Sequence, residues 1–508
     1  MTPIAKEKYP LVIVILLTAA GFILRMYDLG SQSFWIDEAI SSIAATAILD
    51  TGTAVFRSGV AYTRGILNTA LIAFSFTIFG VTESAARIPS VIFGTLTIPL
   101  VYLIGSRWGN SRIGIIAAVL VAFSVWEIAW SRQARMYQQL QFFYILSLYL
   151  FYEFTRTKSI KSLALLILSV EGAILSHVFA YALIPVFVLY LAISTLQERG
   201  WSLGSLKGVN IKAAVIFVLV CAVISGFAYH KGIISLVLQT EIDYYDTYIY
   251  FLKKDLGFFL FVAVPGGTVL MNRDWRKGLL LLSALIIPLY FIFYHVLLLG
   301  TRYLYFVIPI LFILIGYFLD FVIEYSRSVF RSADRPTRLD ASVSEGTIMN
   351  VIAALMLLSA MFISPAFTVV PKERYDLGAN APQPDFRTSY SYVAANMRPD
   401  DAIVSAWTPL TQFYLGKSDY WLAFNMVGTG MEKSLVRGTI RERYTNATAI
   451  TDVEAFKEVV SAHDRGWVIV DATGWYKLRP SIKKYITGNL TRYVAANNNN
   501  VVEVYGWQ

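Results

Sequence analysis

Two adjacent carboxylates, Asp37 and Glu38, are the residues of this chain best suited to chemistry. They stand just after the first long apolar run, in the stretch Ser33-Phe34-Trp35-Ile36-Asp37-Glu38-Ala39-Ile40. An ionised carboxylate is able to accept a proton as a general base. Acidic residues are also common in the first turn of a helix, where the helix dipole favours negative charge. Local sequence alone supports the catalytic and the structural interpretation equally.

The composition places these carboxylates in a membrane protein. Hydrophobic residues make up 56% of the 508 positions, charged residues only 15%, and the mean hydropathy is +0.57. Several apolar runs reach the length of about 20 residues that crosses a bilayer, so membrane lipids are expected partners. The net charge of +9 comes from short loops between these runs, which indicates topology and not a nucleic-acid surface. The single cysteine, Cys221, excludes a disulfide framework and a cysteine-based metal site.

About eleven membrane-spanning segments are predicted. Lys and Arg are concentrated in every second connecting loop, and this bias places the N-terminus in the cytoplasm. The first outer loop, 27–87, and everything after about residue 367 are then extracytoplasmic, in a multi-pass protein of the cell (plasma) membrane. The predicted segments are 10–26, 88–105, 113–130, 137–154, 162–176, 178–195, 212–229, 256–271, 279–298, 303–324 and 348–366.

Two domains are expected. Residues 1–368 form an α-helical polytopic membrane domain, and 369–508 form a small C-terminal extracytoplasmic α/β domain that follows a proline-rich linker. In the second domain the pattern predicts buried strands at 402–406 and 467–470, with helices at 452–463 and 479–488.

The acidic pair is expected on a helix at the membrane surface. Apolar residues recur at helical spacing after Trp35, while Asp37, Ser41 and Ser42 fall on the opposite face. Such a helix lies in the interface, with Trp35 as its anchor and its carboxylates toward water. A second run, 66–79, is too short to span a bilayer comfortably and is predicted to be interfacial or re-entrant.

Arginines at two other outer helix ends are candidates for binding a phosphate. Arg132 and Arg135 lie between the third and fourth predicted segments, and Arg302 lies just before the tenth. The planar guanidinium suits phosphate oxygens, and an arginine at the membrane face is costly unless it is paired. For any single one of them, contact with lipid headgroups is the commoner explanation. Glu127, near the same outer end, is a candidate partner of Arg132 or Arg135.

Further side chains at the outer ends are candidates for facing a substrate. They are His177, Tyr137 and, in the outer loop 241–250, Asp243, Tyr244 and Tyr245. Carboxylates and flat aromatic faces suit a sugar, although tyrosine belts at membrane interfaces have the same composition.

Three of the four histidines, His177, His230 and His295, map to outer ends of predicted segments. Together with the carboxylates they offer ligands for a divalent metal. A metal is not favoured, because single interfacial histidines are usually satisfied by local hydrogen bonds.

Several stretches resemble a known family when taken in order. They are Leu29 to Ala39 with the acidic pair, Phe79 to Ser90, Ser131 to Tyr137, Ser176-His177 and Arg302-Tyr303-Leu304. The chain resembles the GT-C membrane glycosyltransferases over about residues 10–325. The most similar branch is the prokaryotic group related to protein O-mannosyltransferases and the lipid A aminoarabinose transferase. The resemblance implies a GT-C fold with interfacial helices in the first outer loop.

The resemblance also implies an activity. A sugar would move from a polyprenyl-phosphate carrier, dolichyl or undecaprenyl, to a hydroxyl of a protein, lipid or glycan acceptor, with inversion. By residue-to-residue match Asp37 is the base and Glu38 its supporting acid, while Arg135 and Arg302, with Arg132, lie near the carrier phosphate. No cofactor is required, because a phosphate is already a good leaving group. Residues 61–68 lack the Pro-Pro-Leu-Tyr-like pattern of many relatives, which leaves the acceptor open.

Two other classes of protein fit the composition: a transporter or lipid flippase, and a non-catalytic membrane scaffold. Transport sites are expected near the bilayer midplane, between paired broken helices. The charges of this chain gather instead at the outer boundary of the predicted segments. That distribution favours the enzyme.

Overall fold

The structure is a computed structural model, and it describes residues 3–198, 245–295, 300–332, 352, 359, 365–375, 385–423, 435–436, 439–494 and 502–508. The chain divides into two compact units that are interleaved along the sequence. The helical unit comprises Met1–Tyr27, Ser90–Ser131 and Met136–Tyr375. The α/β unit comprises Asp28–Pro89, Arg132–Arg135 and Asp376–Gln508. The first outer loop therefore belongs to the same unit as the C-terminal residues.

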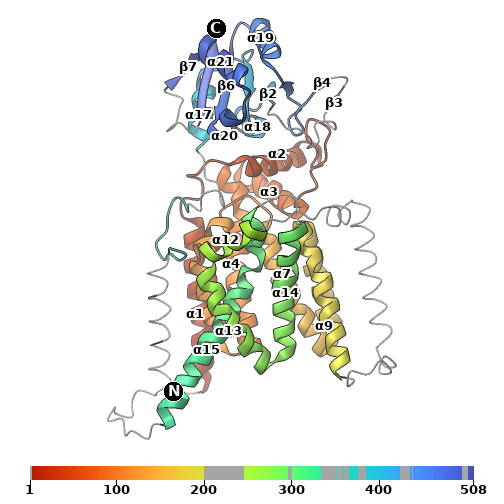
Figure 1. Ribbon diagram of the computed structural model, residues 1–508, viewed down its shortest axis with the longest axis vertical. Coiled ribbons are helices and arrows are strands. Elements are labelled where there is room, and N and C mark those ends of the chain that lie inside the picture. Colours follow the sequence, from red (N-terminus) through yellow and green to blue (C-terminus); the bar gives the residue numbers. More distant parts are fainter. Residues whose placement is uncertain are drawn as a thin grey trace. The chain divides into compact units, whose positions relative to one another are not determined.

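The helical unit is a bundle whose helices run side by side (Figure 1). Five helices of the described chain are long and apolar enough to cross a membrane, or six if the bent pair Tyr245–Lys254 and Gly257–Arg273 is one span. The elements are α1 (Pro3–Met26), α4 (Glu83–Trp108, which begins in the other unit), α5 (Ser111–Phe123), α6 (Val125–Ser131), α7 (Tyr137–Thr157), α8 (Ile160–Ser176), η1 (Val178–Ala182), α9 (Leu183–Glu198), α12 (Tyr245–Asp255), α13 (Gly257–Arg273), α14 (Trp275–His295), η3 (Thr301–Val307) and α15 (Ile308–Ser332).

Each predicted span that falls within the described residues coincides with a helix or a pair of helices. The segments 212–229 and, almost entirely, 348–366 lie outside the described residues. The predicted segment 113–130 is made of two helices, α5 and α6, because the helix breaks at Ser124. There the backbone turns extended and pairs with a distant strand-like segment: the N–H of Val125 donates to the carbonyl of Ala366 over 2.8 Å.

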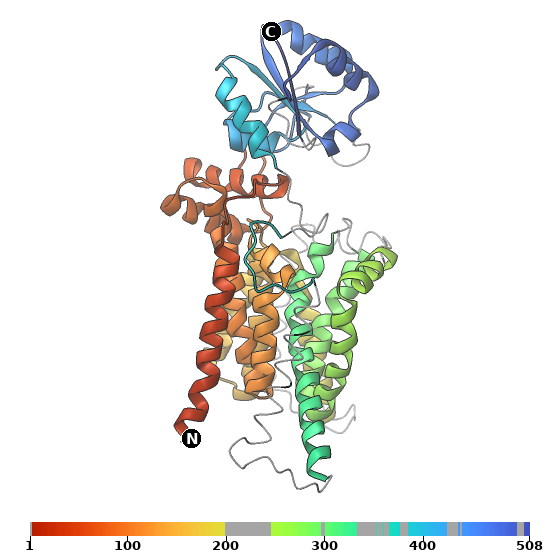
Figure 2. The same ribbon diagram turned by 90° about the vertical axis from the view of Figure 1, so that its left-hand side faces the viewer.

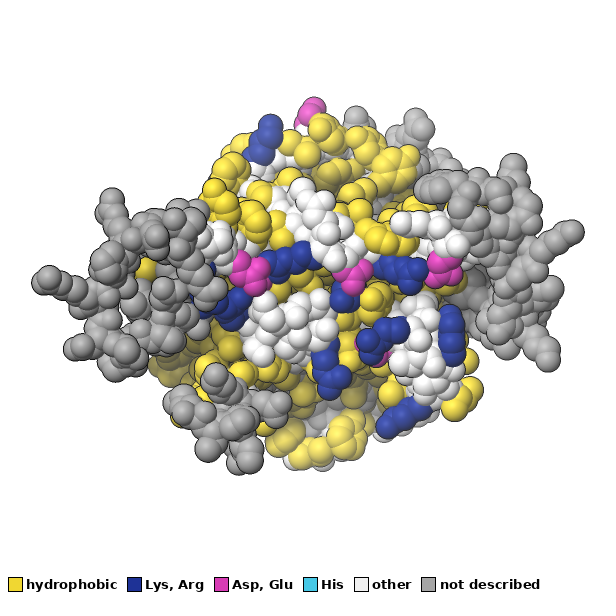
Figure 3. All heavy atoms as spheres, turned by 90° about the horizontal axis from the view of Figure 1, so that it is seen from below, with side chains coloured by type: hydrophobic (Ala, Val, Ile, Leu, Met, Phe, Trp, Pro, Cys, Tyr) yellow, Lys and Arg dark blue, Asp and Glu magenta, His cyan; other side chains and the backbone are white. Residues whose placement is uncertain are grey.

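One end of the bundle is strongly basic. Figure 3 shows this face, on which Lys and Arg side chains outnumber acidic ones. Asp320 of α15 is fully buried there, and it binds Arg112 of α5 at 2.7 Å and Arg273 of α13 at 2.8 Å. Lys277 of α14 donates to the carbonyl of Trp108 at the end of α4 over 3.1 Å. These contacts bring together the helix ends that carry the predicted cytoplasmic cations.

The α/β unit contains a six-stranded sheet in the order β5-β2-β1-β6-β8-β7, covered by helices (Figure 2). The first four strands are parallel, and β8 pairs antiparallel with β6 on one side and with β7 on the other. The strands are β1 (Ala402–Ser405), β2 (Tyr420–Leu422), β5 (Thr448–Ile450), β6 (Gly466–Asp471), β7 (Thr491–Arg492) and β8 (Val502–Trp507), beside a separate pair β3 (Leu435–Val436) and β4 (Thr439–Ile440). The helices are α17 (Arg387–Asn396), α18 (Thr408–Leu415), α19 (Val453–Ala462), α20 (Ala472–Lys477) and α21 (Pro480–Asn489). The predicted strands and helices of this region are confirmed.

Two helices of the first outer loop, α2 (Ile36–Thr51) and α3 (Ile66–Phe79), also belong to this unit and match the predicted segments. Helix α2 packs against α3 and against α18. The prediction that the carboxylates of α2 face water is wrong for Glu38, which is fully buried, as are Ser41 and Ser42 on the predicted polar face. Trp35 is buried within the protein as well, and does not act as an exposed anchor.

Packing of the bundle depends on glycine at one close helix crossing. A Cβ atom placed on Gly266 of α13 would lie 1.9 Å from the carbonyl oxygen of Leu314, whereas a Cβ on Gly267 would lie 3.1 Å from a mobile methyl group of Leu282. We expect Gly266→Ala to force the helices apart at a cost of about 1–3 kcal/mol. Gly267→Ala is the matched control and should be close to neutral. Thermal unfolding in detergent tests this, and equal midpoints for both variants would contradict it.

Candidate active site

A buried ion pair lies at the start of α2. Glu38 is 0% exposed and Arg87 of α4 is 1% exposed. The pair is bidentate: Nε of Arg87 donates to Oε1 of Glu38 over 2.8 Å, and Nη2 donates to Oε2 over 2.9 Å. A forked contact of this kind fixes both position and orientation of the two planar groups.

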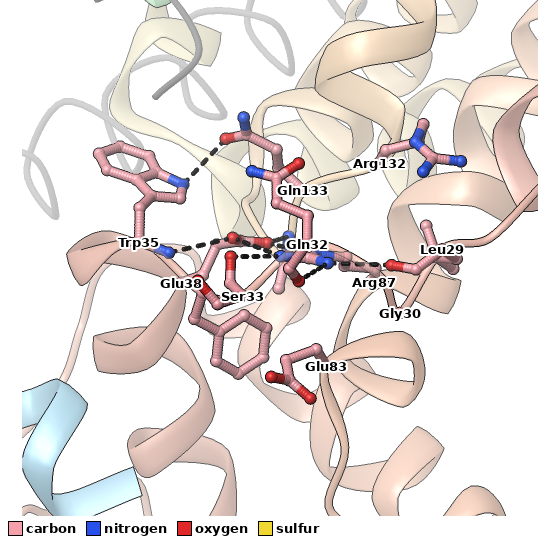
Figure 4. A network of polar contacts seen from close by, with 12 residues as sticks. Leu29, Gly30, Gln32, Ser33, Trp35, Glu38, Glu83, Arg87, Arg132 and Gln133 are labelled. Carbon is pink, nitrogen blue, oxygen red and sulfur yellow. Dashed lines mark hydrogen bonds and ion pairs between the residues drawn. The ribbon is translucent and has the colours of Figure 1, made fainter. Parts of the chain in front are cut away.

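The remaining N–H groups of Arg87 donate to backbone carbonyls of residues 29–33, the loop before α2 (Figure 4). Nη1 donates to the carbonyls of Leu29 and Gln32 over 2.9 and 2.8 Å, and Nη2 donates to that of Ser33 over 3.2 Å. All five N–H groups of the guanidinium are therefore engaged. The irregular segment before α2 is wrapped around this one side chain.

The carboxylate of Glu38 is equally occupied. Besides Arg87 it accepts a hydrogen bond from the backbone N–H of Ala134 over 2.8 Å and one from that of Trp35 over 3.4 Å. The contact with Trp35, the N-cap residue, closes the first turn of α2 in the manner of a capping box. The structure supplies the partner of Glu38 that the sequence did not, and the supporting role expected of Glu38 stays a prediction. A carboxylate that accepts hydrogen bonds from four donors is badly placed to take a proton.

Asp37 differs from its neighbour in exposure. Its side chain is 27% exposed, and Oδ2 lies 3.5 Å from Nη2 of Arg135. Among the described residues this ion pair is the contact that the Asp37 carboxylate makes. The carboxylate is accessible to a substrate, while the backbone on which it stands is fixed by Glu38.

Arg135 is buried and held by several groups near the same turn of α2. Nη1 donates to the carbonyl of Asp37 over 2.9 Å, to Oγ of Ser41 over 2.9 Å and to the hydroxyl of Tyr62 over 3.3 Å. The structure thus pairs an outer-loop arginine with the acidic motif, a contact that the sequence did not predict. Tyr62 was not recognised in the sequence; its only signal was its place in the stretch that departs from the family pattern.

The segment from Arg132 to Arg135 is tied to the acidic loop along its whole length. Nη2 of Arg132 donates to the carbonyl of Asp28 over 3.2 Å. Nε1 of Trp35 donates to Oε1 of Gln133 over 3.0 Å (Figure 4). The structure therefore brings together Asp37, Glu38, Arg132 and Arg135 in the α/β unit.

Three further candidates belong to the helical unit. Tyr137 is buried in an aromatic cluster, with its ring 5.2 Å from Trp130 and 5.6 Å from His177. Nδ1 of His177 accepts a hydrogen bond from the N–H of Phe179 over 3.2 Å and so caps η1. The guanidinium of Arg302 lies over the ring of Tyr303, 5.2 Å from its centroid.

Of the other candidates from the sequence, the structure describes Tyr245. Tyr245 begins α12 and stacks on Tyr294 with ring centroids 6.1 Å apart. Asp243, Tyr244 and His230, like the side chain of His295, lie outside the described residues. In the described part of the chain no group of three or more His, Cys, Asp or Glu side chains is arranged to hold a metal ion.

A second buried polar network was missed in the sequence. Arg25 of α1 is fully buried and donates to the carbonyls of Val121 and Ala122 at the end of α5 over 3.0 and 3.2 Å. Glu127 accepts hydrogen bonds from the hydroxyl of Tyr305 over 2.9 Å and from Gln141 over 3.0 Å. These are the partners of Glu127, in place of the loop arginines suggested by the sequence.

Comparison with known proteins decides the fold. Residues 63–229 match the family model described as dolichyl-phosphate-mannose-protein mannosyltransferase. Apo ArnT from Cupriavidus metallidurans superposes with a TM-score of 0.62 at 14% identity, covering 99% of this chain and 98% of that one. The archaeal oligosaccharyltransferase AglB from Archaeoglobus fulgidus, in complex with an inhibitory peptide and a dolichol-phosphate, gives 0.59 at 12% identity, covering 92% and 70%. The chain has the GT-C glycosyltransferase fold.

The GT-C fold confirms both the predicted fold class and the resemblance drawn from the ordered motifs. ArnT bound to undecaprenyl phosphate also matches, with a TM-score of 0.58 at 14% identity over 98% of this chain and 97% of that one. An uncharacterized protein from Aquifex aeolicus is 30% identical over 142 residues, which are 27% of this chain and 28% of that protein. This chain thus matches less than a third of the length of that relative.

The two neighbouring acids should respond differently to substitution. Glu38→Ala leaves the Arg87 charge buried without its partner, and we expect a loss of about 3–5 kcal/mol. Asp37→Asn is the matched control one residue away, and its thermal midpoint in detergent should equal that of the wild type. Hydrogen exchange should rise across residues 29–35 in Glu38→Ala alone. Equal effects of the two substitutions would contradict the division of roles.

Proposed function

We propose that this protein is an inverting glycosyltransferase that moves a sugar from a polyprenyl-phosphate donor to an acceptor hydroxyl. The observation that carries the proposal is the accessible Asp37 carboxylate 3.5 Å from the buried Arg135 guanidinium, on a helix start fixed by Glu38. A base and a phosphate-binding cation side by side are what displacement of a phosphate by a hydroxyl requires. ArnT, which has the same fold, is known in a complex with undecaprenyl phosphate.

The reaction we propose is a single displacement. Asp37 accepts the proton of the acceptor hydroxyl, and that oxygen forms a bond to the anomeric carbon from the face opposite the phosphate. The bond between the anomeric carbon and the phosphate oxygen breaks, and its electron pair leaves with polyprenyl phosphate. The phosphate gains one negative charge in this step, which Arg135 is placed to stabilise. We propose that no metal is required, because the phosphate is a good leaving group on its own.

The other arginines have supporting parts in this proposal. Arg132 holds the loop that carries Arg135 through its bond to the Asp28 carbonyl. For Arg302, whose guanidinium lies over the ring of Tyr303 in the helical unit, a role near the donor phosphate rests on the family resemblance alone and stays a prediction. The basic end of the bundle supports a cytoplasmic placement of that end, with the first loop and the C-terminal residues outside, in the cell membrane.

Asp37→Asn tests the assignment of the base. We expect release of undecaprenyl phosphate from undecaprenyl-phosphate-linked sugars to fall by roughly 10²–10⁴-fold, since the amide does not accept the proton. Binding of undecaprenyl phosphate itself should be retained. The matched control is Asp50→Asn, which changes an exposed acid near the other end of α2 and should leave the rate unchanged.

Two outcomes would contradict the proposal in different ways. Normal transfer by Asp37→Asn would rule out Asp37 as the base while leaving the activity in place. Failure of the wild-type protein to transfer from any polyprenyl-phosphate sugar would favour a transporter or lipid flippase.

A further inference from the structure

A short hairpin in the first outer loop packs on α2 beside the acidic pair. Its backbone is closed by the N–H of Tyr62, which donates to the carbonyl of Ala54 over 2.8 Å, and by the N–H of Phe56, which donates to that of Val60 over 3.0 Å. Phe56 and Tyr62 are both buried, in one apolar cluster with residues of α2. The hairpin thus presents its aromatic side chains to the helix that carries Asp37.

The hydroxyl of Tyr62 reaches the candidate site directly. It lies 3.3 Å from Nη1 of Arg135 and 3.4 Å from Oγ of Ser41. The same nitrogen of Arg135 donates to the carbonyl of Asp37. Tyr62 is therefore one of the groups that set where the Arg135 guanidinium stands relative to the Asp37 carboxylate.

The hairpin is in turn held by a turn of the C-terminal region. The ring of Tyr444 meets Phe56 edge-on with centroids 5.1 Å apart, and Phe56 meets Tyr62 edge-on with centroids 5.5 Å apart. Oγ of Ser58 donates to the carbonyl of Arg443. Three aromatic rings thus form a continuous chain from the C-terminal region to the Tyr62 hydroxyl.

The turn that carries Tyr444 is itself rigid. The carboxylate of Glu442 accepts from the N–H groups of Tyr444 and Thr445, each over 2.8 Å, and from the Thr445 hydroxyl over 2.9 Å. Burial raises the pKa of the Tyr444 phenol above its usual value, although the nearby Arg64 and Arg443 oppose this. The Tyr444 ring is largely buried and stands on this turn, so it is suited to supporting Phe56 and has little exposed surface for a ligand.

We propose that Tyr62 and Tyr444 are positioning residues for the transfer reaction. The C-terminal turn holds the hairpin, and the hairpin holds the Tyr62 hydroxyl against Arg135, so that the guanidinium stays next to Asp37. The inference rests on the proposed function, in which Arg135 stabilises the leaving phosphate. It gives the C-terminal region a part in building the active site itself, in addition to any contact with the acceptor.

Binding of undecaprenyl phosphate to the purified full-length protein tests the link. Tyr62→Phe removes only the hydroxyl, and we expect binding about threefold to tenfold weaker, because Arg135 loses one of the hydrogen bonds that position it and keeps those to Asp37 and Ser41. Tyr444→Ala removes the supporting ring and should weaken binding similarly. The double variant should be no weaker than Tyr444→Ala, because both changes act through one contact. Tyr444→Phe keeps the ring and should bind like the wild type.

Hydrogen exchange gives a second measurement that does not depend on the donor. Amides of Phe56 and Tyr62 should exchange faster in Tyr444→Ala and at the wild-type rate in Tyr444→Phe. Additive losses of binding in the double variant, or unchanged exchange in Tyr444→Ala, would overturn the inference. Absence of binding by the wild type would overturn the proposed function and the catalytic meaning of the link, while the exchange experiment would still test the mechanical contact.

Discussion

The bidentate ion pair between Glu38 and Arg87 is the interaction on which the candidate site depends. It joins the first turn of α2 to the first turns of α4, and it ties the backbone of residues 29–33 to both. A buried ion pair contributes little net stability, because removing two charges from water costs about as much as their attraction returns. Its effect lies in position. All N–H groups of Arg87 and both oxygens of Glu38 are engaged in hydrogen bonds. Moving the loop before α2 would therefore break bonds to a buried charge.

This constraint explains why two adjacent acids have different parts to play. Successive residues of a helix point about 100° apart, so one side chain of the pair faces the interior when the other faces out. Glu38 faces inward and is fully used. Asp37 keeps an accessible carboxylate on a backbone that its neighbour immobilises, which is the condition for a well-placed base. The acidic motif is therefore one catalytic candidate and one anchor.

Much of the fold follows from local pattern, and most of the site does not. Helical spacing predicted the first helix of the first outer loop, an apolar run of 14 residues marked the second, and the apolar runs around residues 403 and 468 predicted the central strands. The same spacing wrongly placed Glu38 toward water, because Arg87 and Ala134, both distant in the chain, bind its carboxylate. Arg87 was not identified as the partner of Glu38 for a related reason. Which charges meet is decided by the packing of distant segments, and a single sequence carries no signal of that packing.

Arg87 and Arg25, two arginines that are almost fully buried, have the same role in two places. Each donates to backbone carbonyls that have no helical partner: those of the irregular loop before α2, and those at the end of α5, where the helix breaks at Ser124. In apolar surroundings such carbonyls are costly to leave unsatisfied, so irregular backbone survives only where other groups bind it. The irregular backbone is also what displays the candidate residues, since it leads directly into α2 with Asp37 and, after α6, into the loop with Arg135. Arg25 and Arg87 thus stabilise the irregular backbone that precedes the two candidate residues, Asp37 and Arg135.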